Sequence, residues 1–307
     1  MYDSLSLQSY TTNTNNIQDY LSRVKVGIHY DTGYRQFTGY SKNLWVNVIE
    51  NYRINISGSM PKWYFGTNLK TLTKADLPCV FSNLSNELHY DFSTAKATNF
   101  EFGTNFFVKH HVNAYMSLLG YCSTYIRLPN GTKQALTIYY NNSLRSLKFY
   151  NKWAEMKKKD SKNLPCWCEK NKVLRYEVRF DRPDKDFKDK NITVSKLWDD
   201  KFFAKVLASW EKLYFKIIKK KQLMIPESIV LNNSTALNSY CRAYTMSDDD
   251  IREAIQWEIN NREITPSNKS RMNKVVRDSQ TNDKLLVESA RMKELDELVR
   301  QVVSSNQ

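Results

Sequence analysis

The first 180 residues contain short runs in which apolar and polar side chains alternate. This period of two is typical of strands in a sheet with one buried face. Two segments with helical spacing interrupt the runs, at residues 73–88 and 110–119, and Gly120 is a typical helix stop. Strands are predicted at residues 2–8, 43–49, 52–57, 62–65, 100–102, 135–140, 146–150 and 173–180.

Beyond residue 190 the apolar residues recur at helical spacing. Helices are predicted at residues 198–222, 247–260 and 283–303. The second begins at Ser247, which is followed by three aspartates that favour a helix N-terminus. The first closes on a basic run that includes Lys216, Lys219 and Lys220.

The change of pattern predicts two parts. Residues 1–190 are expected to form an α+β domain, an antiparallel sheet with helices on one face. Residues 191–307 are expected to form an all-α C-terminal region that binds DNA or mediates self-association. The charged segment 181–191 contains Pro183 and is expected to link the two parts.

Charge narrows the possible partners. The chain has 46 lysine and arginine residues against 32 acidic ones, a formal net charge of +14. This surplus favours a polyanionic partner, most often nucleic acid, with a membrane surface as the alternative. No run approaches the roughly 18 apolar residues of a membrane span, and the N-terminus does not resemble a signal peptide. Five cysteines without regular spacing fit a reducing cytoplasm, which is the expected location.

Three of the predicted strands carry reactive side chains on their polar face. Tyr150 ends one strand with Lys148 beside it and Lys152 and Glu155 just beyond. Such a grouping suits a phenol that attacks a phosphodiester, because a phenol of pKa ~10 needs a nearby cation or metal to react at neutral pH.

The two other strands present acids in the same way. Glu101 lies between two phenylalanines, and Glu177 lies between Arg175 and Arg179. If the strands share a sheet, both acids lie on the same face as the tyrosine. Carboxylates so placed can hold Mg²⁺ or Mn²⁺, and the arginines could clamp phosphates. The alternative is an ordinary solvated sheet face with cross-strand salt bridges.

These motifs, in this order, resemble the gene II/X replication initiators of filamentous phages and related plasmids. The similar segments are "FEFGTNF", "LTIYYNNSLRSLKFYNKWAEM" and "LRYEVRF", with "GSMPKWYFGTNLKTLTKADL" upstream, and they fall within residues 1–185. The resemblance implies a nickase-like fold and rolling-circle replication initiation. Members nick one strand at an origin through a tyrosine, stay attached to the 5′ phosphate and later rejoin the strand.

The resemblance also implies roles for individual residues. The family's Tyr-x-Lys-x-x-Glu pattern falls on Tyr150, Lys152 and Glu155, and its Arg-aromatic-Glu strand includes Glu177. Its earlier acidic position falls on Glu101, where the family usually has aspartate. We therefore expect Tyr150 and Lys152 to be catalytic, a metal at Glu101, Glu177 and Glu155, and DNA contacts at Arg175, Arg179, Lys148, Lys216, Lys219 and Lys220.

Two other functions remain open at this stage. A non-enzymatic basic DNA-binding protein would have the same charge, and a conjugative relaxase would share the chemistry. The sequence has no Gly-x-x-x-x-Gly-Lys-Ser/Thr loop for ATP, so a host helicase is expected to supply unwinding. A homodimer is a further possible assembly.

Overall fold

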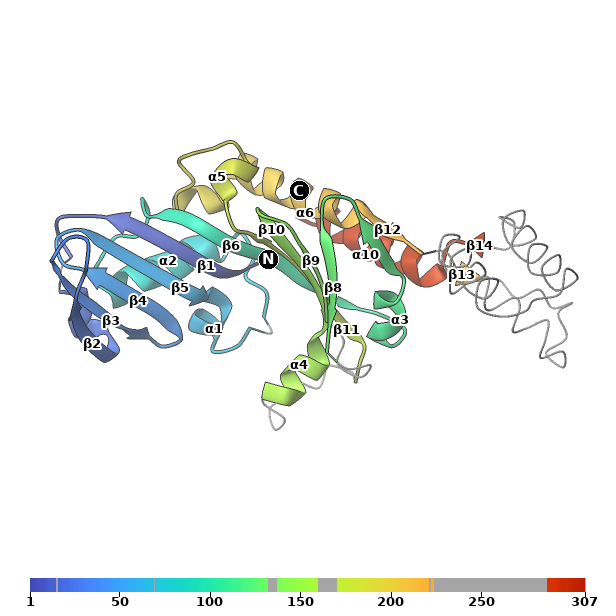
Figure 1. Ribbon diagram of the computed structural model, residues 1–307, viewed down its shortest axis with the longest axis horizontal. Helices are drawn as coiled ribbons and strands as arrows, with labels where there is room; N and C mark the ends of the chain where they lie inside the picture. Colours follow the sequence, from blue (N-terminus) through green and yellow to red (C-terminus); the bar gives the residue numbers. More distant parts are fainter. Residues whose placement is uncertain are drawn as a thin grey trace, which may run out of the picture. The chain divides into compact units, whose positions relative to one another are not determined.

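The computed structural model describes residues 1–14, 16–68, 70–131, 137–159, 170–220, 222–223 and 286–306. Within them, ten strands form one antiparallel sheet in the order β2-β3-β4-β5-β1-β6-β11-β10-β9-β8 (Figure 1). The strands are β1 Tyr2–Tyr10, β2 Ser22–Ile28, β3 Arg35–Ser41, β4 Leu44–Ile49, β5 Arg53–Ser59, β6 Lys96–Phe107, β8 Ile126–Asn130, β9 Thr137–Asn141, β10 Arg145–Asn151 and β11 Val173–Phe180. The predicted α+β class with an antiparallel sheet is confirmed.

The remaining elements are short strands and helices. β7 (Leu119–Cys122) pairs with β12 (Ile217–Lys219), and β13 (Gln222–Leu223) pairs with β14 (Leu286–Val287). The helices are α1 Met60–Phe65, α2 Leu77–Glu87, α3 Val112–Met116, α4 Lys152–Lys159, α5 Pro183–Asp186, α6 Asp200–Phe215 and α10 Ala290–Ser304, with 3-10 turns η1 Ile17–Tyr20 and η2 Ser195–Trp198. None of the described helices is long and apolar enough to cross a membrane.

Helix α6 covers the apolar face of the central strands. Its Trp210 ring lies 4.9 Å from the ring of Tyr176 on β11 and 6.3 Å from that of Phe102 on β6. The Tyr176 hydroxyl donates to the Trp210 carbonyl oxygen at 3.1 Å. The core therefore joins the sheet to a helix that follows residue 190.

Helix α10 packs beside α6 (Figure 1). Asp296 accepts a hydrogen bond from the Tyr214 hydroxyl at 2.6 Å, and the Arg300 guanidinium lies 5.0 Å from the Phe215 ring. Glu294 accepts one from the Tyr115 hydroxyl at 2.8 Å. The last helix thus belongs to the same packed body as the sheet.

By its internal contacts the chain divides into one unit of Met1–Lys219 with Glu294–Gln307, and a second of Lys220–Lys293. The boundary predicted near residue 190 does not coincide with this division. The expected all-α character of residues 191–307 is wrong where β12 interrupts it, because Ile217 and Lys219 pair with β7. The helix predicted at 247–260 lies outside the described residues.

Two local predictions fail for identifiable reasons. Residues 62–65 are not a strand but the end of α1, which Ser59 caps by accepting from the Lys62 amide, with Pro61 in the first turn and Gly66 ending the helix at φ +73°. The expected linker contains α5 and is packed, since the Phe187 ring lies 5.1 Å from that of Phe180. A run of four residues is too short to show either period, so it does not decide between strand and helix.

Candidate active site

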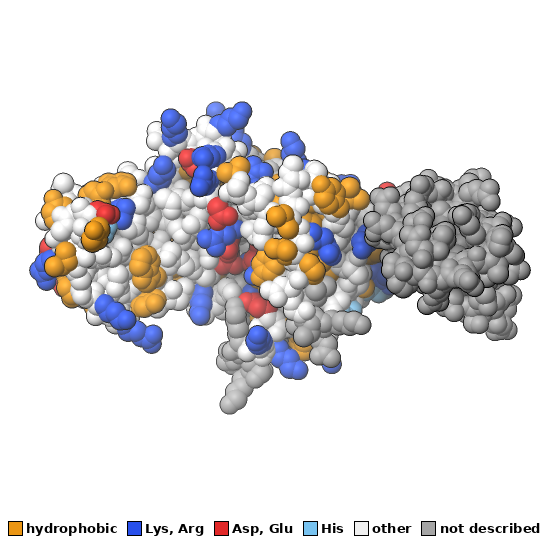
Figure 2. Space-filling view, viewed as in Figure 1, with side chains coloured by type: hydrophobic (Ala, Val, Ile, Leu, Met, Phe, Trp, Pro, Cys, Tyr) orange, Lys and Arg blue, Asp and Glu red, His pale blue; other side chains and the backbone are white. Residues whose placement is uncertain are grey.

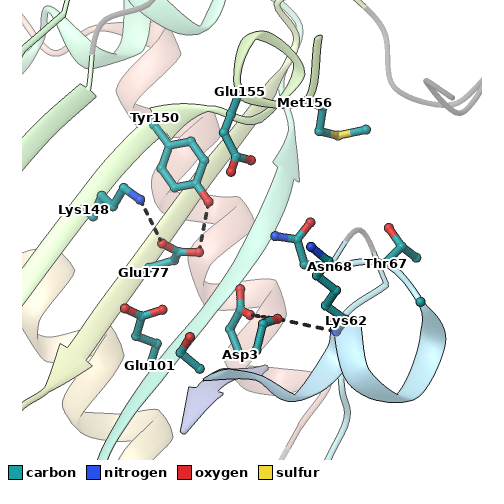
Figure 3. Close-up of a pocket in the computed structure, with 13 residues that line it drawn as sticks. Asp3, Lys62, Thr67, Asn68, Glu101, Lys148, Tyr150, Glu155, Met156 and Glu177 are labelled. Carbon is teal, nitrogen blue, oxygen red and sulfur yellow. Dashed lines mark hydrogen bonds and ion pairs between the residues drawn. The ribbon is translucent and has the colours of Figure 1, made fainter. Parts of the chain in front are cut away.

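A pocket of about 820 Å³ opens on the polar face of the sheet, opposite α6 (Figure 3). Its floor comes from four neighbouring strands, and its walls come from α4 and from α1 with the loop after it. The lining residues are Asp3, Ser4, Ser59, Lys62, Gly66, Thr67, Asn68, Glu101, Lys148, Tyr150, Glu155, Met156 and Glu177. The side chains in the floor are mostly charged.

The strand register brings the three predicted reactive runs together. β11 lies between β6 and β10. Tyr150 pairs with Arg175, Lys148 with Glu177, and Arg179 with Glu101. Directly opposed residues share a face, so the predicted convergence of these runs on one side of the sheet is confirmed. What these residues do is a separate question.

Tyr150 lies at the centre of this arrangement. Its hydroxyl donates to Glu177 Oε1 at 3.1 Å, and Lys148 Nζ lies 4.3 Å from the centre of its ring. The side chain lines the pocket although only 5% of it is exposed. Burial, followed by the charge of Glu177, raises the pKa of Tyr150 well above its ordinary value, so the phenol is protonated at neutral pH.

Arg175, two residues before Glu177 on β11, holds the Glu177 carboxylate in place. Its Nε donates to Glu177 Oε1, its Nη2 donates to Asp3 at 2.5 Å, and its Nη1 donates to Asn105 at 3.1 Å. Burial opposes ionisation of Glu177, but Arg175 and then Lys148 outweigh it and lower the pKa of this carboxyl. The Arg175 side chain is 3% exposed and its donors are used by Glu177, Asp3 and Asn105, so the phosphate contact predicted for Arg175 stays a prediction.

Gly103 makes room for that carboxylate. It lies opposite Glu177 in the sheet, and a Cβ there would come within 2.8 Å of Glu177 Cγ. That separation is shorter than real Cβ contacts, so any larger residue would displace Glu177.

Lys152 is fully buried at the start of α4, and its Nζ donates to Glu155 Oε2 at 2.7 Å. Burial, followed by the charge of Arg175, lowers the pKa of this lysine. Lys152 Nζ lies 5.7 Å from the centre of the Tyr150 ring. The pair therefore lies behind the tyrosine, with only Glu155 lining the pocket.

The other predicted DNA contacts are scattered. Arg179 is 47% exposed in its side chain and forms ion pairs with Asp181 at 2.8 Å and Glu101 at 3.8 Å. Lys216 Nζ donates to Thr124 Oγ1, and Lys219 Nζ to the Tyr214 carbonyl. Lys220 is exposed. None of these three lysines lines the pocket, and their contact with DNA stays a prediction.

A model of the N-terminal part of the phage replication-associated protein known as the gene II protein matches residues 6–201, more than half of the chain. The chain belongs to this family. Membership implies a phage replication protein that initiates rolling-circle replication, in agreement with the resemblance found in the sequence. No curated protein matches the chain.

The segment matched to the gene II protein family contains Tyr150, Glu101, Glu177 and Glu155, but Asp3 precedes it. Asp3 is the pocket carboxylate that sequence reasoning missed. A register shift between Tyr2 and Leu5 interrupts the alternation of β1, and a strict period of two would have placed Asp3 with the buried Leu5. No signal in the sequence alone marks this bulge.

The pocket in this gene II family member offers carboxylate oxygens, the type of ligand that hard divalent cations prefer. Asp3, Glu101 and Glu177 supply carboxylate oxygens, and burial, followed by the charges of Glu177 and Asp3, raises the pKa of Glu101 to about 7. A cation would relieve that repulsion. Within the described residues no three His, Cys, Asp or Glu side chains are grouped closely enough to hold a metal. Mg²⁺ needs only one or two carboxylates when waters and substrate phosphates complete its shell.

The raised pKa of Glu101 predicts that the metal-free protein becomes less stable to unfolding as the pH rises. Below pH 4.5 the carboxyl is protonated in both folded and unfolded chains; as pH rises toward 7 only the unfolded chain ionises freely, so the wild type loses stability. Glu101→Gln removes this loss and is expected to raise the free energy of unfolding at pH 8 by up to about 3 kcal/mol. Urea denaturation at pH 4 and pH 8 with a chelator measures it. An equal effect at both pH values would contradict the assignment.

Proposed function

We propose that this chain nicks and rejoins one strand of DNA at a replication origin through a covalent phosphotyrosine at Tyr150. The observation that carries the proposal is the Tyr150 hydroxyl directed at Glu177 in a pocket whose other charged groups come from five separate elements. An ordinary solvated sheet face has exposed salt bridges, whereas here Arg175, Glu177 and Asp3 are buried. Burial of charge is costly and is common at functional sites.

The proposed step is an in-line displacement at phosphorus. The Tyr150 oxygen bonds to the scissile phosphorus while its proton passes to Glu177 Oε1, and the bond from phosphorus to the 3′ oxygen breaks. The leaving 3′ oxygen takes a proton from water and becomes a free hydroxyl. The 5′ phosphate remains on the tyrosine, and because the phosphodiester energy is conserved, the reverse displacement rejoins the strand without a nucleotide.

Neighbouring side chains prepare the tyrosine for this step. Arg175 fixes the rotamer of Glu177, and Lys148, across the tyrosine ring, offsets negative charge on the phenol oxygen as it reacts. Lys152 and Glu155 fix the turn from β10 into α4. Glu101, with Asp3 or Glu155, would hold Mg²⁺ or Mn²⁺, which when bound neutralises charge on the phosphate.

DNA is the proposed partner, with a host helicase to unwind the duplex and self-association through the C-terminal region. Incubation with single-stranded origin DNA labelled at its 3′ end and Mg²⁺ or Mn²⁺, followed by denaturing electrophoresis, tests the chemistry, because the fragment 3′ of the nick is the one that stays on the tyrosine. A protein band that carries label is expected. DNA binding without any transfer of label would favour a non-enzymatic DNA-binding protein.

Removal of divalent ions gives a second prediction. With EDTA, the yield of covalent adduct is expected to fall by at least ~10²-fold, because the phosphate charge is no longer neutralised, while most single-strand affinity is retained. Gel-shift and adduct assays on the same samples measure both quantities. Restoration by added Mg²⁺ or Mn²⁺ is the control, and undiminished adduct in EDTA would remove the metal from the proposal.

A further inference from the structure

The wall of the pocket across from Tyr150 is formed by α1 and the loop that follows it. Ser59, Lys62, Gly66, Thr67 and Asn68 line this wall, and the Lys62 side chain extends toward the pocket (Figure 3). None of them belongs to the reactive runs found in the sequence. The wall and the tyrosine come from segments about ninety residues apart.

The charges around the pocket are almost all matched. Figure 2 shows acidic side chains near the middle of the visible face, with lysines and arginines around them. Each acid in the pocket has a cation. The pairs are Asp3 with Arg175, Glu177 with Arg175 and Lys148, Glu155 with Lys152, and Glu101 with Arg179.

Lys62 is the exception. In the described part of the chain, its ammonium group forms no ion pair and no hydrogen bond, and the residue is exposed. Its backbone amide donates to Ser59 Oγ at 3.4 Å, which leaves the side chain uninvolved. Among the described lining residues, Lys62 is the cation that remains available to an incoming anion.

A chain of hydrogen bonds fixes this wall relative to the tyrosine. Ser59 Oγ, the cap of α1, donates to Asp3 Oδ1 at 2.8 Å. Asp3 Oδ2 accepts from Arg175, Arg175 donates to Glu177, and Glu177 accepts from the Tyr150 hydroxyl. The start of α1 and the phenol are therefore held by one continuous polar network, and Lys62 is one turn from its end.

We propose that Lys62 binds a backbone phosphate of the single DNA strand that lies in the pocket against Tyr150. The ammonium group neutralises the phosphate as a point charge, and the Asn68 amide, which also lines the pocket, is a further donor to phosphate oxygens. This inference rests on the proposed function, since it takes a single DNA strand as the ligand. In this arrangement α1 positions the DNA strand against the nucleophile.

The test measures single-strand binding without reaction. In a Tyr150→Phe background, the affinity for a short fluorescent single-stranded oligonucleotide of mixed sequence is measured by anisotropy over a series of salt concentrations. Lys62→Gln is expected to weaken binding severalfold at low salt. It is also expected to reduce the slope of log K against log salt by about 0.7, the value for one lost phosphate contact. Lys62→Arg should restore both.

Lys70→Gln is the matched control. It removes the same charge from the loop that follows α1, but Lys70 is exposed, its Nζ lies 5.5 Å from the centre of the Phe65 ring, and it does not line the pocket. Equal slopes for Lys62→Gln and Lys70→Gln would overturn the proposal. Both variants should keep the wild-type melting temperature. The Ser59 cap of α1 uses the backbone amide of Lys62 and not its side chain, and Lys70 is exposed.

The two proposals fail in different ways. If the wild type forms the covalent adduct but Lys62→Gln leaves the salt slope unchanged, the phosphate subsite is wrong and the nickase chemistry stands. If Lys62→Gln lowers the slope but the wild type forms no adduct, the subsite stands and the chemistry is wrong.

Discussion

Tyr150→Phe is expected to abolish covalent attachment to DNA, with a loss on the order of 10³-fold or more in adduct formation, because the ring keeps its place but the nucleophilic oxygen is gone. The fold should tolerate the change, since one hydrogen bond to Glu177 is lost at a cost of about 1 kcal/mol. Label transfer from single-stranded DNA, followed on a denaturing gel, measures the loss.

Tyr139→Phe is the control for this prediction. Tyr139 lies on β9 directly opposite Lys148, on the same face of the sheet, but does not line the pocket. This variant should form the adduct at the wild-type rate. Wild-type adduct levels from the Tyr150→Phe protein would reject the nucleophile, and parallel losses in both variants would indicate a general effect on the sheet.

Arg175→Met should cause the largest loss of stability among the pocket variants. It leaves the buried carboxylates of Asp3 and Glu177 without their shared cation, and breaking such a pair by removing one partner costs about 3–5 kcal/mol. The free energy of unfolding from urea titration at pH 7 measures it. Adduct formation should fall as well, because Glu177 is no longer oriented.

Arg179→Met provides the comparison on the same strand. Arg179 is half exposed and its ion pairs with Asp181 and Glu101 are accessible to water, so its loss should cost under about 1 kcal/mol. If the two arginine variants were equally stable, the buried network would have no special role in the fold.

The convergence of the reactive strands was predictable because it depends only on the period of two. Val173–Phe180 alternates so regularly that its bounds and the face of Glu177 follow from the pattern. Once β6, β11 and β10 are neighbours, Glu101, Glu177 and Tyr150 share a face whatever the rest of the chain does. The sequence does not state which strands are neighbours, so the shared sheet was a condition of the prediction, and the strand order of the structure meets it.

The depth of each side chain was not predictable in this way. Arg175 and Lys152 were expected to contact DNA or the reacting phosphate, but both are buried beneath or behind the tyrosine. Alternation gives the face of a strand and says nothing about what covers it. The buried guanidinium of Arg175 is paired with Asp3. Asp3 lies on β1, far away in the sequence, and faces Arg175 because of the bulge in that strand. Lys62 was missed for a related reason, because its segment was read as a strand.

The contribution of α10 to the core has a consequence for biosynthesis. When the large sheet and α6 have left the ribosome, the hydroxyls of Tyr115 and Tyr214 still lack their acceptors Glu294 and Asp296, which lie about eighty or more residues further along the chain. Contacts this distant in sequence slow folding and prolong the exposure of apolar surface. A nascent polypeptide halted before residue 290 should therefore depend on chaperones.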